Sequence, residues 1–99
     1  MTYWNRVLSQ ASKRNIPVTV TIEEAYERFL EQGRCCFYTK EFLILGKGQT
    51  ASLDRKDSKK GYEKGNINWV HKDINIMKNH FPQEAFFKYC KLVVEHNNL

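Results

Sequence analysis

Residues 51–78, ASLDRKDSKKGYEKGNINWVHKDINIMK, decide the fold of this chain. Two apolar runs, 51–55 and 67–70, flank a loop rich in Lys, Asp, Ser and Gly, which predicts a β-hairpin with a long loop. The segment 71–81 then carries apolar residues at helical spacing. This half of the chain therefore predicts the order strand, strand, helix.

Residues 1–34, which precede this region, predict two helices. In 3–14, apolar residues recur at the spacing of one helical face. The second helix, 21–32, begins with T-I-E-E, in which Thr21 caps the helix and Glu24 reaches back to it. Its apolar stripe is expected to be buried and consists of Ile22, Ala25, Tyr26, Phe29 and Leu30.

Two further segments complete the fold. Residues 35–45 are dense in Cys, Phe, Tyr, Leu and Ile around a polar turn, which predicts two short strands. Pro82 starts a last helix within 82–99. Cys36 and Cys90 are expected to be buried as small apolar residues. The predicted fold class is α+β, with N-terminal helices packed on a hairpin–helix motif and a C-terminal helix.

The composition is that of one folded domain. With 99 residues, 41% of them hydrophobic, the chain can bury a single core. We expect one domain with a helical part (1–34), a hairpin–helix core (35–81) and a C-terminal helix (82–99). No apolar run approaches the roughly 20 residues of a membrane span. Three cysteines without paired spacing favour a reducing, cytoplasmic setting.

The sequence of residues 51–78 resembles the HNH, or ββα-metal, endonuclease family. In that family a strand ends in an Asp-His pair, an Asn begins the second strand, and a helix presents a final His or Asn, often followed by Lys. The positions that match are Asp54-Arg55, Asn66, Asn75 and Lys78. The segment is also similar to small phage and mobile-element HNH-like proteins with L-D-R-x-D-S-x-K-G-Y-x-x-G-N-x-x-W-V. The resemblance implies a phage or mobile-element protein that acts inside a bacterial cell.

The resemblance implies a metal-dependent DNA endonuclease. A hairpin followed by a helix can bring Asp54 against Asn75, and their hard oxygen atoms suit a single Mg²⁺ or Mn²⁺. Such a metal would neutralise charge on the phosphate during cleavage. Lys78 is expected near that phosphate. Asn66 is expected to hold the long loop through hydrogen bonds from its side chain to the backbone.

The position of the usual general base departs from the family pattern. Arg55 stands where the family has His, and a guanidinium with a pKa above about 12 cannot accept a proton. Arg55 is instead expected to clamp the phosphate. The base is left open between His71, Asp57 and a metal-bound hydroxide, while the ordinary pKa of about 10 disfavours Tyr62. His71 has the alternative role of capping the helix, and Asp57 that of capping a turn.

The resemblance implies DNA as the partner, and a net charge of +5 with basic residues crowded in the later half of the chain favours a polyanion there. Structural zinc is not expected, because Cys35-Cys36 is not a C-x-x-C pair and Ile74 stands where a second pair would need a ligand. A homodimer, which would let the domain cut both strands, is left open. His80 and His96 are expected to be surface residues. The lysines expected to contact DNA are Lys56, Lys59, Lys60, Lys64 and Lys72.

Two other functions remain open from the sequence. The first is a catalytically impaired HNH-fold module that binds DNA or protein, with Arg55 marking the lost base. The second is a partner-binding or inhibitory protein that uses the acidic helix 21–32. Binding of Mn²⁺ would separate an active nuclease from a binding module.

Overall fold

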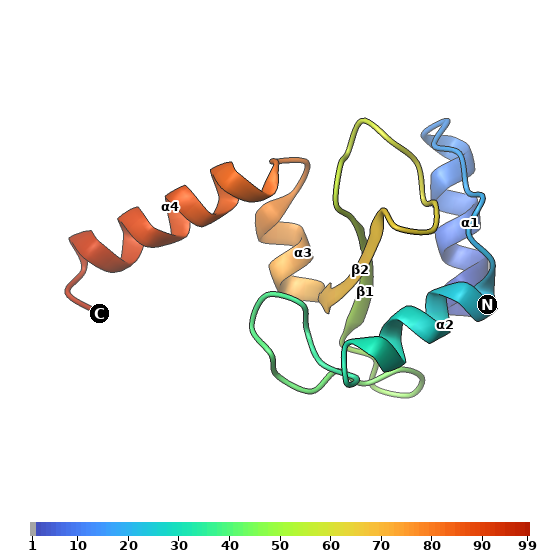
Figure 1. Ribbon diagram of the computed structural model, residues 1–99, viewed down its shortest axis with the longest axis horizontal. Helices are drawn as coiled ribbons and strands as arrows, with labels where there is room; N and C mark the ends of the chain where they lie inside the picture. Colours follow the sequence, from blue (N-terminus) through green and yellow to red (C-terminus); the bar gives the residue numbers. More distant parts are fainter. Residues whose placement is uncertain (1) are drawn as a thin grey trace.

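The computed structural model describes residues 2–99 and has an α+β fold, as the sequence predicted. An antiparallel hairpin lies in the middle, with α1 and α2 on one side and α3 leading to α4 on the other (Figure 1). Within residues 2–99 the elements are α1 (Tyr3–Lys13), α2 (Ile22–Glu31), β1 (Ala51–Arg55), β2 (Ile67–His71), α3 (Lys72–Lys78) and α4 (Gln83–His96). The division into three parts stays a prediction.

The second helix begins at the predicted capping box. The Glu24 backbone N–H donates to Thr21 Oγ1 at 3.1 Å, and the Thr21 N–H donates to Glu24 Oε1 at 2.9 Å. These bonds pair backbone donors at the helix start that have no partner within the helix. The bonds also hold the pKa of Glu24 below its ordinary value.

The predicted buried stripe of α2 is only partly correct. Ala25 and Phe29 are buried, whereas Ile22, Tyr26 and Leu30 are 49%, 45% and 43% exposed. The reason is that α2 packs mainly on β2, so a narrower band of the helix is covered than its apolar pattern suggests.

The core lies between α2 and the hairpin. Trp69 of β2 is 4% exposed, packs edge-on against Phe29 and donates from Nε1 to the backbone oxygen of Ala25 at 2.8 Å. In the hairpin register Leu53 pairs with Trp69 and Asp54 with Asn68. This register fixes where each polar residue of β1 lies relative to α3.

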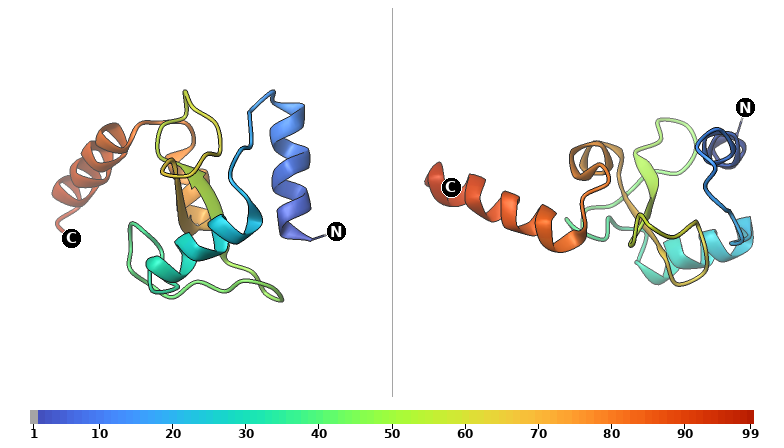
Figure 2. Two further views of the ribbon diagram at one scale, coloured as in Figure 1. Left: turned by 45° about the vertical axis from the view of Figure 1, so that its right-hand side comes forward. Right: turned by 90° about the horizontal axis from the view of Figure 1, so that it is seen from above.

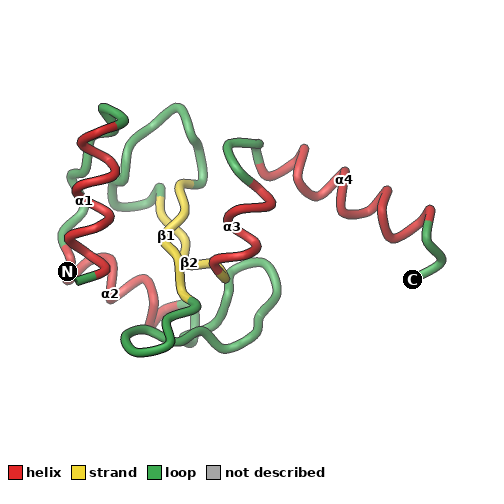
Figure 3. Tube along the Cα trace, turned by 180° about the vertical axis from the view of Figure 1, so that it is seen from behind, coloured by secondary structure: helices red, strands yellow, loops and turns green. Residues whose placement is uncertain are grey.

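Two short strands were predicted within 35–45, and that prediction is wrong. The segment forms an isolated bridge between Cys35 and Phe42 and a tight turn in which the Lys40 N–H donates to the backbone oxygen of Cys36. Lys40 has a φ of 65°, which interrupts an extended chain. The loops between α2 and β1 lie at one end of the hairpin, and the 56–66 loop lies at the other end (Figure 3). Apolar composition alone did not reveal this turn.

The C-terminal helix projects from the rest of the molecule (Figure 2). None of its residues is buried, and Phe86 and Phe87 at its start pack against Tyr38. Cys36 is buried as predicted, but the prediction for Cys90 is wrong, because α4 carries this residue into solvent. Among the described residues, no helix is both long enough and apolar enough to cross a membrane.

Candidate functional site

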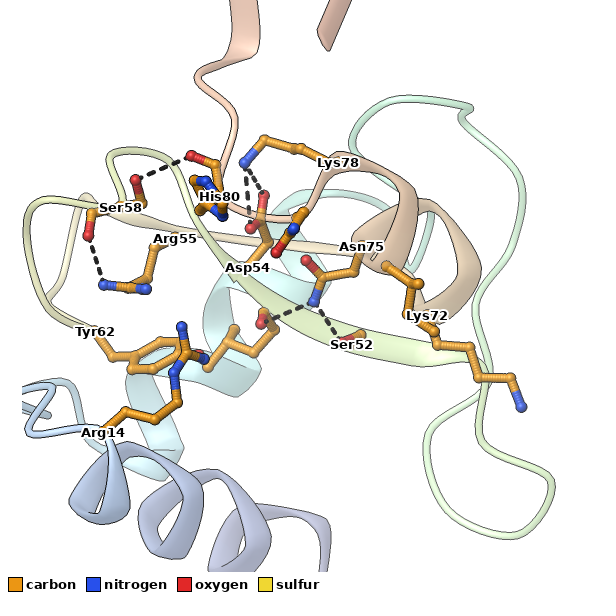
Figure 4. Close-up of a pocket in the computed structure, with 13 residues that line it drawn as sticks. Arg14, Ser52, Asp54, Arg55, Ser58, Tyr62, Lys72, Asn75, Lys78 and His80 are labelled. Atoms are coloured by element: carbon orange, nitrogen blue, oxygen red, sulfur yellow. Dashed lines mark hydrogen bonds and ion pairs between the residues drawn. The ribbon is translucent and has the colours of Figure 1, made fainter.

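A polar cavity of about 340 Å³ opens between β1, α3 and the end of α1 (Figure 4). Asp54 contributes the single carboxylate among its lining residues. The basic side chains around it come from α1, β1 and α3 and are Arg14, Arg55, Lys72 and Lys78. Five predicted site residues therefore meet here, namely Asp54, Arg55, Lys72, Asn75 and Lys78.

A buried ion pair lies at the back of this cavity. Lys78 is the last residue of α3, and its Nζ lies 3.1 Å from Asp54 Oδ2 and 3.4 Å from Oδ1. Lys78 is 1% exposed and Asp54 6%. Only the contact to Oδ1 has the direction of a hydrogen bond, so Oδ2 is buried without a hydrogen-bond partner. Burial raises the pKa of the Asp54 carboxyl, and the Lys78 charge opposes that rise.

Asn75 faces Asp54 from the middle of α3. Its Nδ2 donates to Ser52 Oγ at 2.7 Å and to the backbone oxygen of Leu53 at 3.5 Å. This arrangement turns Oδ1 away from Ser52 and toward Asp54 (Figure 4). The Asn75 amide oxygen accepts neither of these hydrogen bonds, and Asn75 lines the same cavity as Asp54.

The Asp54 carboxylate oxygen and the Asn75 amide oxygen fit a hard divalent cation. Mg²⁺ is commonly bound through one or two protein oxygens while waters and a substrate phosphate complete its coordination. Asp54 Oδ2 and Asn75 Oδ1 would hold the ion, which would compete with Lys78 for the carboxylate. Within residues 2–99 no group of three or more His, Cys, Asp or Glu side chains forms an alternative metal site.

Arg55 extends from the end of β1 into the 56–66 loop. Its Nη1 donates to the backbone oxygens of Ser58 at 2.8 Å and Lys60 at 2.9 Å, and the guanidinium lies over the Tyr62 ring. Burial raises the pKa of Tyr62, which makes this phenol a still poorer base at neutral pH. Arg55 thus organises the loop through Nη1, while its Nε and Nη2 edge has no hydrogen bond within residues 2–99.

Asn66 closes the same loop from its far side. Its Oδ1 accepts from the Asp57 N–H at 2.9 Å, and its Nδ2 donates to the backbone oxygens of Asp57 at 3.1 Å and Gly61 at 2.8 Å. The Asp57 carboxylate accepts from the Lys59 N–H, as a turn-capping Asp does. Asp57 does not line the cavity.

His71 also lies away from Asp54. It pairs with Ala51 across the hairpin, three positions along β1 from Asp54. Its Nδ1 accepts from the Asp73 N–H at 3.1 Å and so caps α3. Neither His71 nor Asp57 is therefore brought into the cavity, and for both the geometry matches the capping alternative.

His80 lines the cavity and was missed as a site residue in the sequence. It is exposed, as predicted, but it follows the end of α3 and its backbone oxygen accepts from Ser58 Oγ at 3.2 Å (Figure 4). The sequence signal was its position two residues after Lys78. Arg14 was also missed, because its place beside the hairpin depends on how α1 packs.

The loop lysines divide between different surroundings. Lys56 and Lys64 line a separate cavity beside α2, where Lys64 Nζ lies 3.9 Å from Glu24 Oε2. Lys59 and Lys60 are exposed in the loop. Of the lysines predicted to contact DNA, only Lys72 lines the cavity that contains Asp54.

The cavity as a whole suits an anionic group with a bound cation. Basic side chains surround one buried carboxylate, and an imidazole, His80, is available to accept a proton.

Comparisons of the chain with protein-family models, curated proteins and solved structures found no match.

Proposed function

We propose that this chain is a DNA endonuclease of the HNH type that depends on one Mg²⁺ or Mn²⁺. The observation that supports it most is the buried Asp54 carboxylate, which lines a basic cavity together with Asn75 and whose Oδ2 accepts no hydrogen bond although it is ion-paired with Lys78. A metal bound there would neutralise charge on the scissile phosphate and stabilise the leaving oxygen. Phage or mobile-element origin and action in the bacterial cytoplasm belong to the same proposal, and a dimer stays open.

Three residues of the cavity would bind or activate the reactants. Arg55 would bind the phosphate through its free Nε and Nη2 edge, since Nη1 is held by the loop. Lys72 would add a second positive charge at the mouth. His80 would accept the proton of the attacking water, because a neutral imidazole has a nitrogen that can act as a general base.

The test is cleavage of supercoiled plasmid in Mg²⁺, in Mn²⁺ and in EDTA. Wild-type protein is expected to nick or cut plasmid only with metal, and Asp54→Asn to abolish cleavage. His80→Ala should slow it by about 100-fold or more, the usual effect of losing a general base. Asp57→Asn makes the same chemical change outside the cavity and should stay active.

Plasmid that stays intact with every metal at high protein concentration would contradict the proposal. Cleavage by Asp54→Asn at the wild-type rate would contradict it equally. Far-UV circular dichroism of each variant establishes that lost activity is not lost folding.

A second candidate is a module of the same fold that binds DNA without cleaving it. The observation that favours it is the Lys78 ammonium at 3.1 Å from Asp54 Oδ2, which already supplies the carboxylate with a positive charge. Under this reading DNA binding is independent of metal. Calorimetric titration with Mn²⁺ separates the two, since only the nuclease requires an ion at Asp54.

A further inference from the structure

A second cavity of about 420 Å³ continues from the first along β1. The residues that line both cavities are Ser52, Leu53, Tyr62, Lys72 and Asn75. Because so much of their lining is common, the two cavities form one groove. We call it the α1 groove, because α1 lines its outer wall with Arg6, Gln10 and Arg14.

The wall formed by α1 is regular. Arg6, Gln10 and Arg14 are four residues apart, which places them on one side of the helix and its C-terminal cap, and all three are exposed. Tyr3 holds α1 against the hairpin, since its hydroxyl accepts a hydrogen bond from the Leu53 N–H at 2.8 Å. The helix therefore presents two guanidinium groups and an amide along the groove.

The charge of the α1 groove is almost entirely positive. Arg6 and Arg14 lie on one wall, Lys72 on the other and Arg55 at the end, whereas Asp54 is the only carboxylate in the lining. The cavity beside α2 differs, because three glutamates of α2 accompany Lys56 and Lys64 there. A polyanion would thus be attracted to the α1 groove and repelled from the surface of α2.

We propose that one strand of a DNA duplex lies along the α1 groove, with its phosphates contacted by Arg6 and Arg14 on one side and Lys72 on the other. This path leads the backbone to Asp54. The proposal rests on the proposed function, and it moves the main phosphate contacts from the 56–66 loop to α1. Gln10, between the two arginines, is placed to donate to a phosphate or sugar oxygen.

The test is binding of a fluorescein-labelled DNA duplex, followed by anisotropy in EDTA over a series of salt concentrations. The double variant Arg6→Gln/Arg14→Gln is compared with Lys56→Gln/Lys64→Gln, which removes the same charge from the cavity beside α2. We expect at least about tenfold weaker binding for the arginine variant, and a salt slope smaller by about 1.8, the value for two phosphate contacts. The lysine variant should bind within about twofold of wild type.

Equal weakening by the two variants would overturn the proposal, since only net charge would then matter. Absence of wild-type binding at low salt would overturn it too. The proposed function fails separately: DNA binding with the expected pattern but no cleavage in Mg²⁺ or Mn²⁺ supports the α1 groove and contradicts the nuclease. Metal-dependent cleavage by the wild-type protein, together with unchanged DNA binding by the arginine variant, supports the nuclease and contradicts the α1 groove as the DNA path.

Discussion

The ion pair of Asp54 and Lys78 is the residue-level feature on which the site depends. Their side chains are 7% and 2% exposed, so neither charge is solvated by bulk water. A buried pair contributes little net stability, but removing one partner leaves an uncompensated charge in the interior. The pair thus keeps a carboxylate buried and ionised beside a cavity, which a lone Asp at this depth would not achieve.

Replacing Lys78 with Met should lower the free energy of unfolding by about 3–5 kcal/mol, because Asp54 loses its partner. Adding Asp54→Asn to Lys78→Met should restore much of that loss, since no charge then remains buried. Urea unfolding followed by circular dichroism measures both. A Lys78→Met protein as stable as wild type would show that the pair does not exist in solution.

The buried Tyr38 hydroxyl is expected to make the free energy of unfolding fall at alkaline pH. Its hydroxyl is buried without a hydrogen-bond partner, and burial together with the nearby charge of Asp54 raises its pKa to about 12. The folded state therefore favours the neutral phenol, so stability present below the ordinary pKa of 10.0 falls as pH rises from there toward 12. Urea unfolding at several alkaline pH values measures this loss.

Tyr38→Phe removes the buried hydroxyl and should remove most of that alkaline loss. At neutral pH we expect the variant to be more stable by about 1 kcal/mol, because an unsatisfied polar atom leaves the interior. A variant that is less stable than wild type at neutral pH would indicate that the hydroxyl has a partner.

At the scale of elements, the 56–66 loop depends on one side chain. Asn66 makes three hydrogen bonds to the loop backbone. We expect Asn66→Ala to cost about 2–3 kcal/mol, because the buried backbone oxygen of Gly61 and the partly buried backbone groups of Asp57 lose their hydrogen-bond partners. Chemical denaturation measures this, with Lys59→Ala in the exposed part of the loop as the control. Equal stability of the two variants would contradict the role of Asn66.

Sequence reasoning succeeded for elements that local patterns define. The capping box of Thr21 and Glu24 and the hairpin with its following helix were predicted because their signals lie within a few residues of one another. The prediction of two strands within 35–45 was wrong because a run of apolar residues can be buried in turns as well as in strands. The predicted burial of Tyr26 was wrong because it depends on which element covers α2.

At the scale of the whole molecule, α4 is held by little more than its first turn. A helix of 14 residues without a buried position is marginal in water. We expect its backbone amides to exchange with deuterium much faster than those of α2, which has Ala25 and Phe29 in the core. Hydrogen exchange followed by mass spectrometry measures this. Protection of α4 equal to that of α2 would mean that something covers it in solution.

The candidate site was predictable from the sequence only for residues that lie on the hairpin and the helix directly after it. Asp54, Asn75 and Lys78 come together because a hairpin and the next helix bring them there. Arg14 reaches the same cavity through the packing of α1, and Lys56 lies beside α2 through the course of a long loop. Such placements depend on the tertiary arrangement, which charge and spacing along the chain do not determine.

The central proposal is that Asp54 and Asn75 hold a divalent cation in the basic cavity. Anomalous X-ray scattering from crystals grown with Mn²⁺ tests it most directly. We predict a peak between Asp54 Oδ2 and Asn75 Oδ1, with Lys78 moved from its present contact. An empty cavity at saturating Mn²⁺, with Lys78 still against Asp54, would contradict it.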